Sequence, residues 1–242
     1  MADAKVALVV GAGEATGGAI ARRFAREGFT ACVTRRTADK LQPLVEQIER
    51  AGGKARAFGS DARKEEQVVE LVQTIEREIG PIEVCVFNVG GNVRFPIREM
   101  TARVYTKVWE MAALAGFLVG REAAKVMVPR GRGTILYTGA TASLRGGKGF
   151  AAFAGAKHAL RALAQSMARE LGPEGIHVAH VVIDGAIDTP FIRDNFPERY
   201  ALRDKAGILD PEAIAEAFWQ LHRQARSAWT HELDLRPWME PW

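Results

Sequence analysis

Short, uninterrupted apolar runs alternate with longer segments of helical periodicity along the whole chain. In the longer segments apolar residues recur every three or four positions, which is typical of helices that cover one face of a sheet. The apolar runs predict strands at 6–10, 30–34, 55–59, 84–88, 134–139, 177–183 and 229–235. The periodic segments predict helices at 17–28, 38–51, 68–79, 102–128, 150–171 and 211–224. Because strands without polar alternation are buried on both faces, this order predicts a parallel sheet covered by helices on both sides.

The length and composition fit one domain. The chain has 242 residues, of which 48% are hydrophobic and 26% charged, an ordinary balance for a globular protein. No composition shift marks a linker and no internal repeat is visible. We therefore predict a single α/β domain over 1–242, with a doubly wound parallel sheet of about seven strands.

The distribution of charge, the lengths of the uncharged runs and the two cysteines indicate which partners and which compartment to expect. The net charge of +4 is spread along the chain, and basic pairs such as Arg22-Arg23 fall on helical patterns, where we expect them to be solvated. We therefore predict no nucleic-acid partner. The longest uncharged run, 133–144, is too short to span a bilayer, and the start lacks a secretory pattern. Cys32 and Cys85 are expected to be buried thiols, so we predict a cytoplasmic protein without membrane contact.

A glycine-rich segment, GAGEATGGAIA at 11–21, follows the first strand directly and opens a helix. A phosphate placed there would meet free backbone N–H groups and the positive end of the helix dipole. Gly11 allows a tight turn, Gly13 lets the backbone approach a ligand, and Gly17 lets helix and strand pack closely. The context predicts a dinucleotide site rather than a plain turn.

Two arginines end the second strand, where a dinucleotide site meets the adenosine ribose. An acidic residue at this place would accept hydrogen bonds from the 2′-hydroxyl, whereas Arg35 and Arg36 would pair with a 2′-phosphate. This favours NADP, with NAD possible, because Glu14 in the glycine loop would repel a phosphate and the two arginines could be solvated surface residues. No metal-ligand spacing is visible among the five histidines.

With these motifs the chain resembles the short-chain dehydrogenase/reductase family over almost its whole length. The family's TGxxxGxG loop reads VGAGEATG here, its NAG reads Asn88-Val89-Gly90, and AFAGAK at 152–157 corresponds to its YxxxK helix. The resemblance implies a Rossmann-type fold and an oxidoreductase. It places the adenine at Asp61 and the nicotinamide carboxamide at Ile187 and Thr189, after a turn that is Asp184-Gly185 instead of the family's Pro-Gly. The cofactor-binding residues so predicted are Gly11, Gly13, Glu14, Ala15, Thr16, Gly17, Arg35, Arg36, Asp61, Ala62, Asn88, Val89, Gly90, Lys157, Ile187 and Thr189.

The resemblance also predicts a catalytic centre that has lost most of its polar groups. In the family a tyrosine hydroxyl exchanges the proton, its pKa lowered by a lysine four residues later, while a serine polarises the substrate oxygen. Lys157 matches the lysine, but Phe153 stands at the tyrosine position, Ala140 at the serine position and Ala112 at that of a supporting asparagine. Loss of a positioned acid or base costs about 10²–10⁴-fold in rate. Ser143, three residues after Ala140, is the candidate catalytic substitute beside Lys157.

The resemblance further implies how the chain assembles. Helices 102–128 and 150–171 carry apolar residues beyond one stripe, and in the family such helices form a subunit interface, so we expect a homodimer or homotetramer. Residues 190–210 would form the substrate loop. The tail 236–242 would either pack across another subunit or close its own active-site mouth.

The sequence supports one leading hypothesis and two alternatives. The leading hypothesis is an oxidoreductase that transfers hydride between NADP(H) and a small apolar substrate at an altered catalytic centre. The first alternative is a catalytically silent, dinucleotide-binding sensor or structural subunit of an oligomer. The second is a scaffold without cofactor.

Overall fold

One sheet of seven parallel strands, in the order β3-β2-β1-β4-β5-β6-β7, organises the computed structural model, which describes residues 5–240. The strands are β1 (Val6–Val10), β2 (Thr30–Arg35), β3 (Lys54–Gly59), β4 (Ile82–Phe87), β5 (Gly133–Thr138), β6 (Ile176–Ile183) and β7 (Glu232–Leu235). The principal helices are α1 (Thr16–Arg26), α2 (Gln42–Arg50), α3 (Glu65–Glu78), α4 (Ala102–Trp109), α5 (Ala115–Met127), α6 (Ala151–Leu171), α7 (Pro190–Asn195), α8 (Pro197–Tyr200) and α9 (Pro211–His222). The predicted α/β architecture is confirmed.

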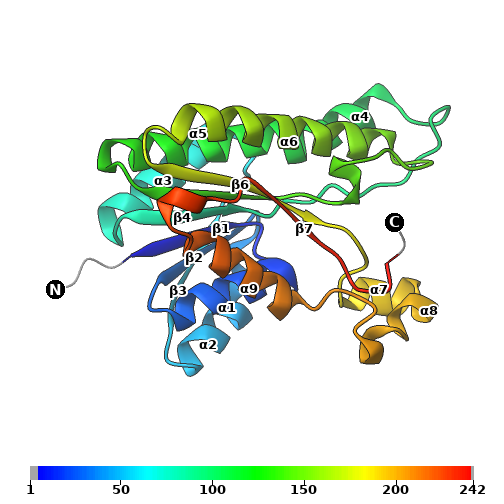
Figure 1. Ribbon diagram of the computed structural model, residues 1–242, viewed down its shortest axis with the longest axis horizontal. Helices are drawn as coiled ribbons and strands as arrows, with labels where there is room; N and C mark the ends of the chain where they lie inside the picture. The colour runs from blue at the N-terminus through cyan, green and yellow to red at the C-terminus, as the bar shows by residue number, and fades with distance from the viewer. Residues whose placement is uncertain (1–4, 241–242) are drawn as a thin grey trace.

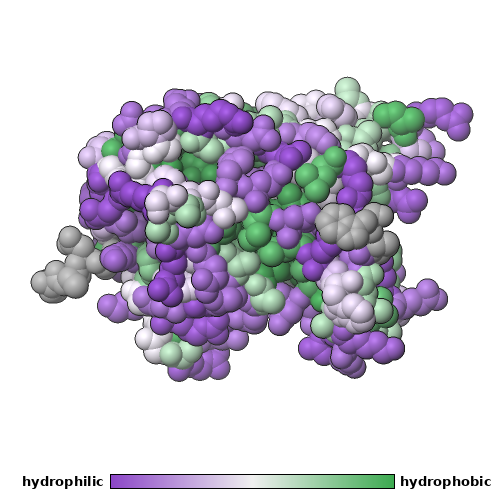
Figure 2. Space-filling view, viewed as in Figure 1, coloured by the Kyte–Doolittle hydropathy of each residue, from purple (hydrophilic) through white to green (hydrophobic). Residues whose placement is uncertain are grey.

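Helices cover both faces of the sheet. Helices α1, α2 and α9 lie on one face, and α3, α5 and α6 lie on the other (Figure 1). Every residue of β1, β4 and β6 is buried, which explains why these strands are apolar without alternation. Strand β7 forms the edge and is only partly buried. In the view toward this edge, apolar residues gather in a hollow between α9 and the α7–α8 segment (Figure 2).

The strand order reverses between β1 and β4, and this places two loops side by side. Strand β1 pairs with both β2 and β4, and Val10 is opposite Phe87 in the register. The glycine loop after Val10 and the segment that begins at Asn88 therefore leave the sheet together. Open parallel sheets bind ligands at the carboxyl edge of such a reversal.

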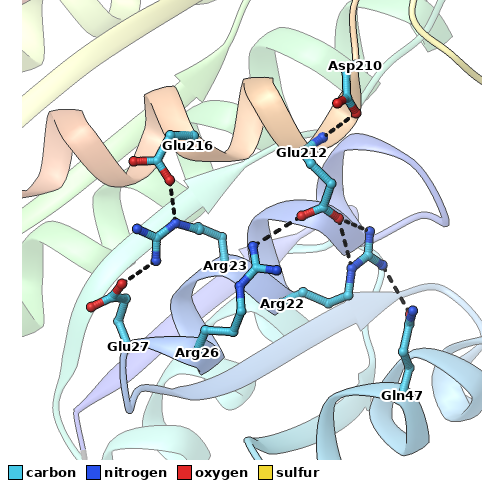
Figure 3. Close-up of polar contacts among 8 residues, drawn as sticks. All are labelled: Arg22, Arg23, Arg26, Glu27, Gln47, Asp210, Glu212 and Glu216. Atoms are coloured by element: carbon cyan, nitrogen blue, oxygen red, sulfur yellow. Dashed lines mark hydrogen bonds and ion pairs between the residues drawn. The ribbon is translucent and has the colours of Figure 1, made fainter. Parts of the chain in front are cut away.

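Ion pairs join α1 to α9 across the first face. Arg22 contacts Glu212 at 2.6 Å, Arg23 contacts Glu216 at 2.6 Å, and Arg26 also reaches Glu212 (Figure 3). The expectation that Arg22 and Arg23 are solvated is wrong, because α9 covers their side chains, which are only 21% and 13% exposed. Partners more than 180 residues away could not be seen in a local helical pattern.

Two predicted elements differ from the observed ones. The predicted helix 102–128 is interrupted by a π-helical turn, Glu110–Leu114, between α4 and α5, a widening that apolar periodicity does not reveal. The predicted strand 229–235 begins only at Glu232. None of the helices within the described residues is long and apolar enough to cross a membrane.

Candidate functional site

The glycine loop presents free backbone donors at the start of α1. Gly11 has φ +88°, a left-handed conformation, and a Cβ built on it would lie 2.6 Å from the carbonyl oxygen of Asn88. A Cβ built on Gly13 meets nothing within 4 Å, so this position faces open space. Ala15 is the N-cap of α1, and no side chain caps the helix. The first-turn N–H groups are thus available to an anion.

Asn88 fixes this loop from the neighbouring strand. Its Nδ2 donates to the carbonyl oxygen of Gly11 at 3.0 Å. A Cβ on Gly17 would lie 2.5 Å from that same carbonyl oxygen and 2.9 Å from Asn88 Nδ2, so only glycine fits there. Thr16 beside it is buried, whereas Glu14 is exposed.

A cavity of about 180 Å³ lies next to the glycine loop. Its lining includes Gly11, Arg35, Arg36, Asp61 and Gly90. Ala62, Val89 and Met111 contribute further walls. The structure therefore brings Gly11 of the glycine loop together with predicted residues at the end of β2 and after β3 and β4. The predicted residues from Gly13 to Gly17 are not part of this lining, and neither are Ile187 and Thr189.

Arg63 is a residue of this cavity that sequence reasoning missed. Its Nε and Nη2 donate to both carboxylate oxygens of Asp61, at 2.9 and 2.6 Å. The hydrogen bond from the Arg63 guanidinium lowers the pKa of Asp61 to about 2. Asp61 is thus a fixed carboxylate with its own counter-ion, and three arginines surround the cavity. Nothing in the local pattern singles out Arg63 from other surface arginines.

Lys157 is buried and bonded to two backbone carbonyl groups. Its Nζ donates to Thr138 O at 2.8 Å and to Val89 O at 3.3 Å, and the residue is 3% exposed. Burial lowers its pKa to about 8. The lysine does not extend along α6 to solvent. It ties α6 to the carboxyl ends of β4 and β5.

The positions singled out around Lys157 form an apolar cluster. Phe153, Ala112 and Ala142 belong to one packed group, and Ala140 packs against it. The Phe153 ring centroid lies 5.9 Å from Lys157 Nζ. Ala112 lies within the π-helical turn and is fully buried. Three separate segments, at Ala112, at Ala140 and Ala142, and at Phe153, thus meet here, and each contributes an apolar side chain.

The hydroxyl groups of Ser143, Thr141 and Tyr137, which lie near this cluster, form hydrogen bonds within the protein. Ser143 is fully buried, and its Oγ accepts the N–H of Ala140 at 3.1 Å, which holds the turn after β5 and gives no support to a catalytic role. Thr141 Oγ1 donates to Asp184 at 2.5 Å. Tyr137 packs in the core, where its hydroxyl donates to Gly116 O and contacts Met167 Sδ. His158 is exposed and turned toward Ala154 O.

His180 is a second buried polar group that the sequence did not reveal. Its Nδ1 lies 3.2 Å from Glu232 Oε2, and its Nε2 has no partner among residues 5–240. A Cβ on Gly139 would lie 2.4 Å from Nε2, so the ring fills the space that this glycine leaves. Burial lowers the pKa of His180 to about 4, so the ring is neutral at neutral pH.

The predicted substrate loop and the tail pack on each other within one chain. Ile187 forms a bridge with Leu209, and Thr189 Oγ1 accepts the N–H of Ile192 at the start of α7. Trp238 Nε1 donates to Lys205 O at 3.0 Å. The described part of the tail, residues 236–240, thus contacts the substrate loop of its own chain, while 241–242 lie outside the described residues.

Comparison with known proteins identifies the family. The family model described as "short chain dehydrogenase" matches residues 5–199. The chain belongs to the short-chain dehydrogenase family. A crystal structure of a short-chain dehydrogenase from Rhodopseudomonas palustris is 51% identical, with a TM-score of 0.83, and the match covers 97% of this chain and 99% of the other.

Two further similar structures contain dinucleotides. A metagenomic short-chain oxidoreductase in complex with NADP is 25% identical, with a TM-score of 0.82 over 96% of this chain and 97% of that one. A 7α-hydroxysteroid dehydrogenase complexed with NADH and 7-oxo glycochenodeoxycholic acid is 26% identical, with a TM-score of 0.88 over 98% and 94%. Members of the family similar to this chain therefore use either nicotinamide dinucleotide.

Proposed function

We propose that this short-chain dehydrogenase binds NADP(H) and transfers hydride to or from a small molecule at a centre that lacks the family's hydroxyl groups. The observation that carries the proposal is the pair Arg35 and Arg36, which line the same cavity as Gly11 beside the uncapped start of α1. No carboxylate ends β2, where the adenosine ribose of a dinucleotide is bound in such folds.

The residues present fit a dinucleotide phosphate. The open space at Gly13 leaves room for a phosphate oxygen, and the first turn of α1 contains no acidic side chain. Arg35 and Arg36 can each donate to a 2′-phosphate, and charge-assisted bonds of this kind are about twice as strong as neutral ones. Glu14 is exposed and free to turn toward solvent. The 25% identical structure with NADP agrees with the preference, whereas the 26% identical one with NADH keeps NAD as the alternative to test.

Lys157 is the residue that we propose contacts the nicotinamide ribose. An ammonium group has three N–H donors, and the carbonyl groups of Thr138 and Val89 take two of them. The third donor remains for a ribose hydroxyl. When bound, NADPH would supply a hydride for reduction and NADP⁺ would accept one in the reverse direction.

Phe153, Ala140 and Ala112 are proposed to occupy the positions of the family's tyrosine, serine and asparagine. Their packing into one cluster supports this correspondence, as does the location of Lys157 one helical turn after Phe153. The cluster offers no acid beside the reacting carbon. The substrate itself or a bound water then supplies the proton, which suits a conjugated or already polarised apolar substrate.

Fluorescence titration with NADPH and NADH tests the binding step. We expect saturable binding of both and a lower dissociation constant for NADPH. A screen of ketones and enones for NADPH oxidation, with Lys157→Ala as the control, tests turnover. Absence of saturable binding of either dinucleotide would contradict the proposal. Tight binding without turnover of any compound would favour the silent subunit instead.

We further place the protein in the cytoplasm as a homodimer or homotetramer that associates through α4, α5 and α6. Its cysteines, Cys32 and Cys85, are both buried and unpaired, which suits a reducing compartment. Trp109 and Phe117 on the surface of α4 and α5 are each 42% exposed, an apolar area suited to a second copy.

Sedimentation of Trp109→Glu tests this assembly. We expect a lower mass than for the wild type, because a charge would be buried at the interface. Trp238→Glu is the matched control, since Trp238 is more exposed and lies in the tail. Equal masses for all three proteins would remove α4 from the interface.

A further inference from the structure

A buried carboxylate lies at the carboxyl end of β6, where no role in cofactor binding is assigned to it. Asp184 is completely buried. Thr141 Oγ1 donates to its Oδ1 at 2.5 Å, and Arg236 Nη2 lies 3.0 Å from its Oδ2. Arg145 approaches both oxygens, with Nη1 and Nη2 each 3.4 Å away. A buried charge is costly unless it is paired, so these contacts are what keep Asp184 in place.

The two arginines differ in what else they contact. Arg236 is 12% exposed and also pairs with Asp234 at 2.7 Å, so it belongs to a closed network. Arg145 is 49% exposed, and Asp184 is the only carboxylate that its guanidinium contacts within residues 5–240. A guanidinium has five N–H donors in a rigid fork. Two of them face Asp184, which leaves three N–H donors for a further partner.

Arg145 belongs to the segment that connects two parts of the apolar cluster, Ala140 and Ala142 on one side and Phe153 on the other. It follows Ala140 by five residues in the segment between β5 and α6, and Phe153 lies eight residues further on. Asp184 follows β6, the neighbour of β5 in the sheet. Both residues thus leave the sheet at its carboxyl edge, where open α/β sheets bind their ligands.

The segment between β5 and α6 carries positive charge only, and the carboxylate that Arg145 contacts, Asp184, comes from the loop after β6. The segment 139–153 contains Arg145 and Lys148 but no acidic residue. The side chain of Arg94 lies against Gly149 of the same segment. In the substrate loop, by contrast, arginines and acids pair, as in Arg203 with Asp188. A ligand group that complements this rim is an anion.

We infer that Arg145 binds a carboxylate of the substrate, with Asp184 and Thr141 as positioning residues that hold its guanidinium toward the reaction centre. A planar carboxylate matches the free edge of the guanidinium with two parallel hydrogen bonds. The apolar body of the substrate then lies against Phe153 and Ala140. The inference rests on the proposed function and specifies its substrate class, an apolar carboxylic acid that carries the oxidised or reduced carbon.

Calorimetry on the NADPH-loaded protein tests this with paired probes that cannot be reduced. The probes are 4-phenylbutanoate with 4-phenylbutanamide, cyclohexanecarboxylate with its amide, and octanoate with its amide. We expect at least one acid to bind about tenfold or more tightly than its amide. Arg145→Met should abolish this preference, a loss of about 10- to 100-fold for the acid, and Arg145→Lys should restore part of it. Lys148→Met, which removes a charge from the same rim, should change the preference less than about threefold.

Asp184→Asn and Thr141→Val test the positioning role. Each should lower the preference for the acid several-fold while the affinity for NADPH stays unchanged, an outcome that a merely structural role would not give. Thr141→Val keeps the Asp184 carboxylate and therefore serves where Asp184→Asn fails to fold. No preference for any acid in the wild type, or a preference that survives Arg145→Met, would overturn the inference. Failure of the proposed function is separate, because it appears as absent NADPH binding before any probe is added.

Discussion

Around the glycine loop the candidate site consists of backbone N–H groups and charged side chains, whereas around Phe153 it consists of apolar side chains. Gly11, Arg35 and Asp61 line the first region, and Asn88 holds its loop through a hydrogen bond. Phe153 and Ala112 fill the second region together with Ala142. Lys157 stands between the two regions and contacts backbone carbonyl groups from both β4 and β5.

The difference separates two demands that one site usually combines. Phosphate recognition needs an uncapped helix start and a few fixed cations, and the fold supplies these whatever the reaction. Proton transfer needs a hydroxyl at one place, and in the proposed function Phe153 fills that place without one. A site can therefore keep its cofactor region intact while its reaction region changes chemistry.

The largest effect is expected when hydroxyl groups are introduced into the apolar region around Phe153. We expect Phe153→Tyr combined with Ala140→Ser to raise NADPH oxidation with simple ketones by about 10²–10⁴-fold, since a positioned general acid contributes that much. Initial rates at saturating NADPH measure it. Phe150→Tyr is the matched control, because Phe150 packs on the same cluster but lies seven residues, about two helical turns, before Lys157. A double variant no faster than this control would show that the cluster is not the reaction centre.

A smaller effect is expected from removing charge in the phosphate region. We expect Arg35→Leu with Arg36→Leu to weaken NADPH binding by about 10- to 100-fold and to leave NADH nearly unchanged, because only NADPH has the 2′-phosphate. Titration of both dinucleotides measures the ratio. Arg50→Leu, an exposed arginine of α2 that pairs with Glu46, is the control. Equal losses of affinity for NADPH and NADH would show that the two arginines attract either dinucleotide and do not recognise the 2′-phosphate.

The sequence predicted the sheet well because its signals are local, and the cofactor region was proposed from signals of the same kind. Apolar runs, a glycine cluster after β1 and a basic pair after β2 each lie within a few consecutive residues. The register from Phe153 back to Ala140 and Ala112 came from the family resemblance, and the structure packs these three residues together.

The parts that sequence missed depend on partners distant along the chain. In the sequence, Asp184 stands out only because it replaces the proline of the family's Pro-Gly turn. Its hydrogen-bond and ion-pair partners come from two other segments, the turn after β5 and the tail. Burial of His180 against Gly139 likewise depends on two neighbouring strands. Ser143 was proposed from proximity in sequence, which reveals neither its burial nor its hydrogen bond from the N–H of Ala140.

The smallest effect tests the residue that joins the two regions. Burial lowers the pKa of Lys157 to about 8, so the ammonium is present below that pH and is lost as the pH rises through it. If the ammonium holds the nicotinamide ribose, NADPH affinity should fall about tenfold between pH 7 and pH 9.5, because the neutral amine donates more weakly. Fluorescence titration across this range measures the change. Lys157→Met removes the titrating group, so its weaker binding should not vary with pH in the same interval. A wild-type profile that parallels that of Lys157→Met would place the ribose elsewhere and leave Lys157 as a tie between α6 and the two strands.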